Sequence, residues 1–240
     1  MDRDLAAALA RMSALAYEDI DVVRVALPDA QIALLDHDDT QAYLVVWPEG
    51  VAAVAFRGTQ VTANWSWPDI KTNILQGRVP WLGGAGQEVH GGYHEAVLDT
   101  LDEVRRFTAD YRGRGQCVYF TGHSLGGALA ALAASVLDAT ATYTFGAPRV
   151  GNNEFAKAMA GRNIFRLVYG RDIAPSYPHP LFGYRHGGER WQLNESRELV
   201  RGGSWRDFFH FPVATGVLDH RVENYVENLA RKPLMGKSTI

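Results

Sequence analysis

The chain of 240 residues lacks several features that would place it in a class directly. It has one cysteine, Cys117, so it can form neither an intrachain disulfide nor a metal site built from cysteines alone. Because Cys117 lies in the apolar run 117–121, we expect it to be a small buried side chain. No stretch approaches the roughly 18 apolar residues of a membrane span, so no transmembrane segment is predicted. Lys and Arg do not cluster and the net charge is −3, which gives no support to nucleic-acid binding.

The first ten residues carry acids where a secretory signal peptide carries net positive charge. Leu5, Leu9, Met12 and Leu15 then follow at helical spacing and predict an amphipathic helix. We therefore expect no signal peptide and a cytoplasmic location, unless the sequence is the trimmed form of a secreted protein.

The remaining chain predicts one domain over residues 1–240, because it contains no repeat, low-complexity tract or linker. Strands are predicted at 31–36, 41–47, 51–56, 117–121, 142–145 and 164–169. Helices are predicted at 93–111, 125–138, about 153–160 and 221–231, and the segment 185–204 is irregular or forms short strands. Strands that alternate with helices form parallel βαβ units, which indicates an α/β fold.

Residues 57–92 follow no single period. They contain Trp65, Trp67 and Trp81 and a glycine-rich stretch at 83–86. A loop of this length in a compact domain is usually functional and is often a lid over an active site, here at about 60–90. The three tryptophans either face an acyl chain or a lipid surface, or pack the lid onto the body of the protein.

Residues 122–126 read Gly-His-Ser-Leu-Gly between the predicted strand 117–121 and the predicted helix 125–138. This pattern is typical of a nucleophile elbow, a tight bend that exposes a serine hydroxyl. The elbow predicts Ser124 as a nucleophile at the N-terminus of a helix, where free N–H groups stabilise negative charge.

A serine nucleophile needs a histidine to accept its proton and a carboxylate to hold that histidine. Asp172 is the best acid, because it follows the strand 164–169 at the carboxyl edge of the sheet. Four histidines follow Ser124 with an acid in between: His179, His186, His210 and His220. The first two lie close behind Asp172, and His210 lies in an aromatic segment. We therefore expect His220 to be the base, with Asp219 or a nearby residue able to cap the last helix.

An ester hydrolase also needs two donors for the oxyanion of its tetrahedral intermediate. The N–H of Leu125, next after the nucleophile, is one. The other comes from the turn after an earlier strand, where Thr59 follows 51–56. The segment 90–93, His-Gly-Gly-Tyr, is an alternative, but it leads into the helix just before the elbow strand and is one element too late.

Taken together, these segments resemble the class 3 (fungal-type) triacylglycerol lipase family of α/β-hydrolases. The matching segments are Ala55-Phe-Arg-Gly-Thr59, Asn64-Trp65, Val89-His-Gly-Gly-Tyr93, Thr121-Gly-His-Ser-Leu-Gly-Gly-Ala-Leu-Ala130, Thr144-Phe-Gly-Ala-Pro-Arg-Val-Gly-Asn152, Asp172-Ile-Ala-Pro175 and Asp219-His220-x-x-x-x-Tyr225. The resemblance implies an α/β-hydrolase fold, with a mostly parallel central sheet flanked by helices and a lid after Thr59. It also implies Ser124 as nucleophile, Asp172 as orienting acid, His220 as base, and Thr59 and Leu125 as oxyanion donors.

The expected function is therefore hydrolysis of carboxylic esters, with an acylglycerol as substrate at a lipid–water interface. The alternatives are an esterase or acyltransferase acting on short-chain, aryl or other polar esters, or a catalytically silent protein that binds a hydrophobic ligand. No cofactor or metal is predicted, because His90 and His94 lie four residues apart without a third ligand. The family's secreted fungal members have disulfides and a signal sequence, and we expect this chain to have neither. Its lid sequence at 64–70, which includes Pro68, is also its own.

Overall fold

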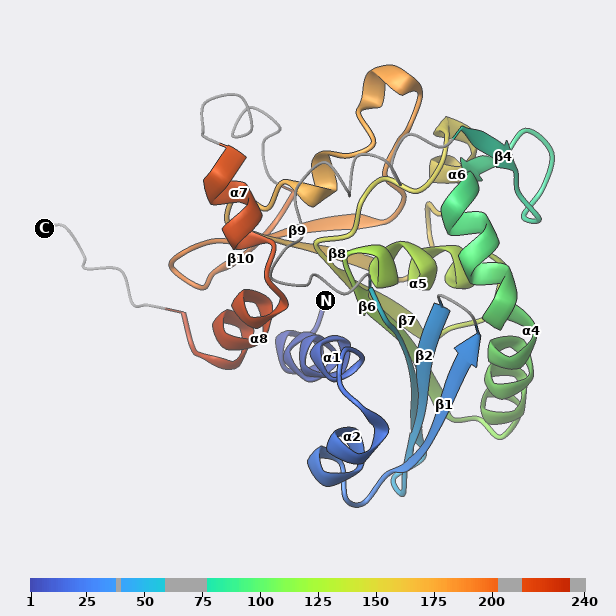
Figure 1. Ribbon diagram of the computed structural model, residues 1–240, viewed down its shortest axis with the longest axis vertical. Helices are drawn as coiled ribbons and strands as arrows, with labels where there is room; N and C mark the ends of the chain where they lie inside the picture. The colour runs from blue at the N-terminus through green and yellow to red at the C-terminus, as the bar shows by residue number, and fades with distance from the viewer. Residues whose placement is uncertain (38–39, 59–76, 203–212, 234–240) are drawn as a thin grey trace, which may run out of the picture.

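The six predicted strands and two further short strands form one eight-stranded sheet, with the order β1-β2-β3-β6-β7-β8-β9-β10 (Figure 1). The structure is a computed structural model that describes residues 1–37, 40–58, 77–202 and 213–233. Five neighbouring strands are parallel: β3 (Val51–Phe56), β6 (Cys117–His123), β7 (Ala141–Phe145), β8 (Ile164–Tyr169) and β9 (Glu189–Leu193). The strands outside this group are antiparallel to their neighbours: β1 (Gln31–His37) and β2 (Thr40–Trp47) at one end of the sheet, and β10 (Leu199–Arg201) at the other. The mostly parallel central sheet is confirmed.

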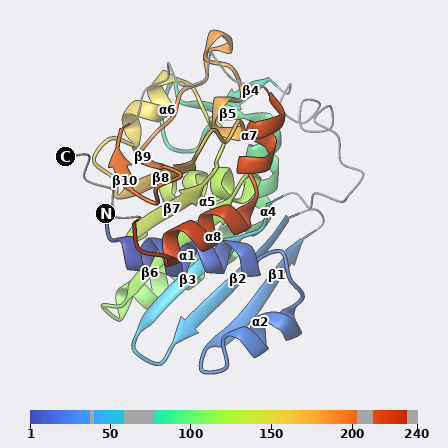
Figure 2. The same cartoon turned by 90° about the vertical axis from the view of Figure 1, so that its left-hand side faces the viewer.

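Helices cover both faces of this sheet, as Figures 1 and 2 show. On one face, α1 (Arg3–Leu15) packs beside α8 (Val222–Ala230), and the Arg3 guanidinium donates hydrogen bonds to three carbonyl oxygens at the end of α8. On the other face lie α4 (Gly91–Gly113) and α5 (Leu125–Val136). The parallel strands are therefore buried on both sides, which explains their nearly continuous apolar sequences.

Among the α-helices of the described residues, α2 (Ile20–Ala26) and α7 (Val213–Asp219) were not predicted. Each has only seven residues, and α2 buries one side chain, that of Val23, so no helical period can be recognised. The predicted short helix appears as α6 (Asn153–Ala158), and 185–204 contains the short strands β9 and β10. Cys117 is half-buried at the first position of β6, which corrects the expectation that it is buried. Within the described ranges, no helix combines the length and the apolarity needed to traverse a bilayer.

The last part of the predicted lid segment forms a hairpin of β4 (Arg78–Pro80) and β5 (Glu88–His90). Trp81 follows β4, is 5% exposed, and donates from Nε1 to Ser135 Oγ at 2.7 Å. Ser135 lies eleven residues beyond Ser124, which is about 16 Å at the rise of an α-helix. Of the two interpretations of Trp81, the structure therefore supports packing and not contact with an acyl chain. Thr59, Trp65 and Trp67 lie outside the described residues.

Replacing Trp81 with phenylalanine tests this assignment. We expect Trp81→Phe to lower the free energy of unfolding by about 1 kcal/mol, because it removes a buried hydrogen bond and leaves a small gap. Urea denaturation measures the change. A variant as stable as the wild type but altered in its preference for ester chain length would contradict the packing role.

Candidate active site

Ser124 lies at a strained bend between β6 and α5. Its φ is 56° and its ψ is −126°, a backbone conformation that favours glycine. A Cβ on Gly122 would overlap the Gly126 carbonyl group, and a Cβ on Gly126 would overlap Phe56 O. The bend therefore requires a glycine on each side of the serine, as the nucleophile-elbow interpretation predicts.

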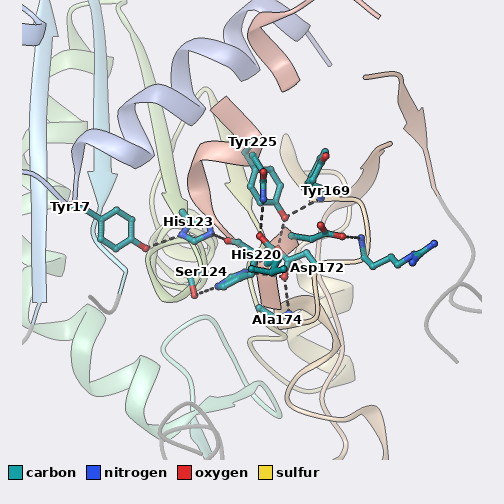
Figure 3. Close-up of polar contacts among 12 residues, drawn as sticks. Tyr17, His123, Ser124, Tyr169, Asp172, Ala174, His220 and Tyr225 are labelled. Carbon is teal, nitrogen blue, oxygen red and sulfur yellow. Dashed lines mark hydrogen bonds and ion pairs between the residues drawn. The ribbon is translucent and has the colours of Figure 1, made fainter. Parts of the chain in front are cut away.

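The structure brings together the three residues predicted from separate segments (Figure 3). Ser124 Oγ lies 2.9 Å from His220 Nε2, and His220 Nδ1 lies 2.9 Å and 3.0 Å from the two carboxylate oxygens of Asp172. Asp172 follows β8, and His220 lies between α7 and α8. Asp172 is fully buried and His220 is 8% exposed, whereas Ser124 is half-buried. The Ser–His–Asp order and contacts are those of a hydrolase triad.

Asp172 is buried with donors on both carboxylate oxygens. The Ala174 N–H donates to Oδ1 at 2.9 Å, and the Tyr225 hydroxyl donates to Oδ2 at 2.5 Å. Burial, followed by the nearby Asp172, raises the pKa of Tyr225 well above 10, so its hydroxyl keeps the proton that it donates. Tyr225 belongs to the segment 219–225 that resembles the lipase family, but its contact with Asp172 was not predicted. The sequence of a helix does not distinguish such a tyrosine from one that only packs in the hydrophobic core.

A second histidine, His123, holds His220 in place. His123 Nε2 lies 2.6 Å from the His220 carbonyl oxygen, which can only accept, so Nε2 carries the proton. Its Nδ1 then accepts from the Tyr17 hydroxyl at 2.9 Å. Burial, followed by His220, lowers the pKa of His123 well below 6.5 and keeps the ring neutral. His123 and Tyr17 were missed, because the elbow motif leaves position 123 unspecified and Tyr17 lies far away in sequence.

The turn that carries Asp172 is joined to the loop that carries His220. Asp219 Oδ2 accepts from the Arg171 N–H at 2.8 Å, whereas α8 begins after Arg221 with no side-chain cap. The expectation that Asp219 caps the last helix is therefore wrong. Gly146 packs against the same site with a φ of +59°, and a Cβ there would overlap Asp172 Oδ2 and lie 3.0 Å from His220 Nδ1.

The other candidate histidines have different roles. His186 Nε2 donates to Pro175 O at 2.8 Å, and His179 Nδ1 accepts from the Leu181 N–H at 3.2 Å. His210 lies outside the described residues. Of the histidines that the structure describes, His220 is the one that contacts Ser124.

The N–H of Leu125 is the first of α5 and meets no backbone acceptor in the described chain. It therefore remains available beside Ser124, as an oxyanion donor requires. The segment 90–93 was the alternative source of an oxyanion donor. His90 is buried and stacks on Tyr93 with ring centroids 4.0 Å apart, and α4 begins at Gly91, so this segment leads into the helix as predicted. The second predicted donor, Thr59, lies outside the described residues.

Comparisons with known proteins agree with this geometry. Residues 53–182 match a family model described as Lipase (class 3). A secreted mono- and diacylglycerol lipase of Fusarium solani is 33% identical over 149 residues, which cover 59% of this chain and 43% of that protein. A lipase of Rhizomucor miehei is 32% identical over 168 residues, which cover 62% of this chain and 43% of that protein. The chain thus spans less than half the length of these relatives.

A comparison with solved structures also finds lipases. The solved structure of Rhizomucor miehei triacylglyceride lipase has a TM-score of 0.76 and 25% identity, and the match covers 90% of this chain and 92% of that one. This likeness confirms the predicted α/β-hydrolase fold.

Removing the Tyr225 hydroxyl should destabilise the protein, because a buried carboxylate loses one of its donors. We expect Tyr225→Phe to lower the free energy of unfolding by about 1.5–3 kcal/mol, the range for hydrogen bonds to charged groups. Urea denaturation measures the loss. Tyr111→Phe is the matched control, since the Tyr111 hydroxyl makes no hydrogen bond to the described residues; equal losses in the two variants would contradict the assignment.

The neutral state of His123 predicts a dependence of stability on pH. Its pKa is lowered in the folded protein, so below about pH 6.5 the unfolded chain binds the additional proton. Stability therefore falls as the pH drops, by about 1.4 kcal/mol per pH unit for this histidine. His123→Gln keeps a donor and an acceptor in similar places and should reduce that slope by about this amount in urea unfolding between pH 6.5 and 5. The exposed His179→Gln is the control; an unchanged slope in His123→Gln would argue against a neutral His123.

Proposed function

The chain belongs to the class 3 lipase family, and we propose from this that it is a serine carboxylic-ester hydrolase, a lipase that cleaves acylglycerol esters through an acyl-enzyme on Ser124. One observation carries the proposal: an unbroken hydrogen-bonded path from Ser124 Oγ through His220 to Asp172. The path starts at a half-buried hydroxyl on a strained bend and ends at a fully buried carboxylate.

In the acylation half-reaction, His220 Nε2 accepts the Ser124 hydroxyl proton while Oγ attacks the carbonyl carbon of the ester. The carbonyl oxygen becomes an oxyanion, which the Leu125 N–H and Thr59 stabilise. His220 then donates its proton to the leaving alcohol as the ester C–O bond breaks, and the acyl group remains on Ser124.

Deacylation repeats these steps with water. His220 removes a proton from the water molecule, whose oxygen attacks the acyl-enzyme. Collapse of the second tetrahedral intermediate returns the proton to Ser124 and releases the carboxylic acid. Asp172 orients His220 through Nδ1 and stabilises the imidazolium that forms in each half.

The substrate class is supported by what the relatives are named for. The Fusarium solani relative is a mono- and diacylglycerol lipase, and the Rhizomucor miehei structure is that of a triacylglyceride lipase. We extend acylglycerol esters to this chain on that basis. The segment after Thr59, with Trp65 and Trp67, is the proposed lid over the acyl pocket at a lipid–water interface.

Initial rates on p-nitrophenyl esters from acetyl to palmitoyl, together with emulsified triacylglycerol, test the proposal. We expect cleavage of long chains and of the emulsion, and a loss of about 10⁴-fold or more in Ser124→Ala. Ser124→Gly is the matched control for folding: it relieves the positive φ and should be inactive yet at least as stable as the wild type.

Each other outcome has a definite meaning. Cleavage of short esters alone would keep the nucleophile but make the protein an esterase. Product formed only when an alcohol acceptor is added would make it an acyltransferase. Absence of turnover that depends on Ser124 would refute ester hydrolysis and favour a silent binder.

A further inference from the structure

Basic side chains gather on the face of the sheet that α5 covers, next to the loop after Asp172. Arg166 of β8 is the register partner of Thr144 in β7 and of Arg190 in β9. A Cβ on Gly127 of α5 would lie 3.2 Å from Thr144 Cβ, so Thr144 faces that helix. Register partners on parallel strands point to the same face, so Arg166 and Arg190 point there too. The loops on either side add Arg149 and His186.

The charges in this group repel one another. Burial, followed by Arg190 and Arg149, lowers the pKa of Arg166 to about 9. Burial, followed by Arg185 and Arg190, lowers the pKa of Arg149 to about 10. Both arginines therefore remain charged at neutral pH. Burial and the same arginines lower the pKa of His186 well below 6.5, so its ring is neutral.

No carboxylate pairs with Arg149 or Arg166 anywhere in the part of the chain that the structure describes. Arg149 Nη1 instead donates to the carbonyl oxygens of Ser176 and Pro178. These acceptors are neutral. Burying cationic groups without a counter-charge is costly, so the arrangement calls for a negative charge.

Three polar atoms in the same region are buried without a hydrogen-bond partner in the described chain: Arg166 Nε, Thr144 Oγ1 and Ser176 Oγ. Buried polar atoms in native proteins almost always have a partner. The Arg166 N–H can only donate, and both hydroxyls can donate. A bound species that only accepts would satisfy all three atoms and also neutralise the charge.

We propose that this cluster is a binding site for a small monovalent anion of the chloride type, held by Arg166, Arg149 and the hydroxyls of Thr144 and Ser176. A water molecule would satisfy the donors but would leave the charges uncompensated. A multivalent anion would cost far more to desolvate at a buried site.

Such an anion would act on the loop that carries the catalytic acid. Arg149 binds the carbonyl oxygens of Ser176 and Pro178, and His186 binds that of Pro175. This loop begins with Ala174, whose N–H binds Asp172. By neutralising Arg149 and Arg166, the anion would stabilise the loop in the conformation that orients Asp172.

Thermal unfolding of the full chain in sodium chloride and in sodium gluconate, at equal ionic strength, tests the proposal without reference to activity. Gluconate is too large for a site formed by these buried atoms and controls for screening. We expect a saturable rise in Tm with chloride alone, of about 2–4 °C at five times its dissociation constant. Equal Tm values in the two salts would overturn the proposal.

Variants and a heavier halide locate the site. Arg166→Met should abolish the chloride-specific rise, whereas Arg106→Met, the same change on the exposed side of α4, should retain it. Thr144→Val removes only a hydroxyl and should weaken chloride binding about 3–10-fold, the effect of one hydrogen bond. If Arg166→Met does not fold, the weaker chloride binding of Thr144→Val tests the proposal in its place. In bromide-soaked crystals we expect an anomalous peak between Arg166 and Thr144; bromide at surface sites alone, or a full rise in Arg166→Met, would overturn the proposal.

Discussion

The carboxylate of Asp172 is the group on which the site depends, because a buried charge is tolerated only when every oxygen has a donor. Three segments meet that requirement: its own turn through the Ala174 N–H, α8 through the Tyr225 hydroxyl, and the loop of His220 through Nδ1. Gly146 leaves the space that the carboxylate occupies. The arrangement of the site therefore follows from the need to give one buried carboxylate its hydrogen-bond donors. His220 is one of these donors, and the same hydrogen bond orients its ring.

The parallel sheet places these segments within reach of one another. β3, β6, β7 and β8 all end at the same edge, and their following residues supply the glycine turn at 58, Ser124, Gly146 and Asp172. The loop of His220 arrives from beyond the sheet and is held from two sides, by Asp219 on the Arg171 N–H and by His123 on the His220 carbonyl. The sheet therefore positions Ser124 and Asp172, whereas side-chain contacts position His220.

Prediction from the sequence succeeded where the signal was local. The elbow at Ser124 can be recognised from the glycines on either side of it, and Asp172 from its position after an apolar strand. The contacts of Tyr225, His123 and Tyr17 were not predicted, because each joins segments that lie far apart in sequence. Asp219 was assigned to a helix cap because its neighbour in space, Arg171, is 48 residues away in sequence. For Trp81, the sequence did not distinguish a tryptophan packed in the core from one that faces the substrate.

The packing of α1 against α8 has a consequence for the order in which the protein can assemble. Arg3 binds carbonyl oxygens at the end of α8, and His220, the proposed base, lies just before that helix. A nascent chain whose α8 is still inside the ribosome can therefore have the sheet and the serine elbow but not the residue that we propose as general base. Contacts between segments so far apart also slow folding. We therefore expect the proposed catalytic site to be completed only after α8 has emerged and packed against α1.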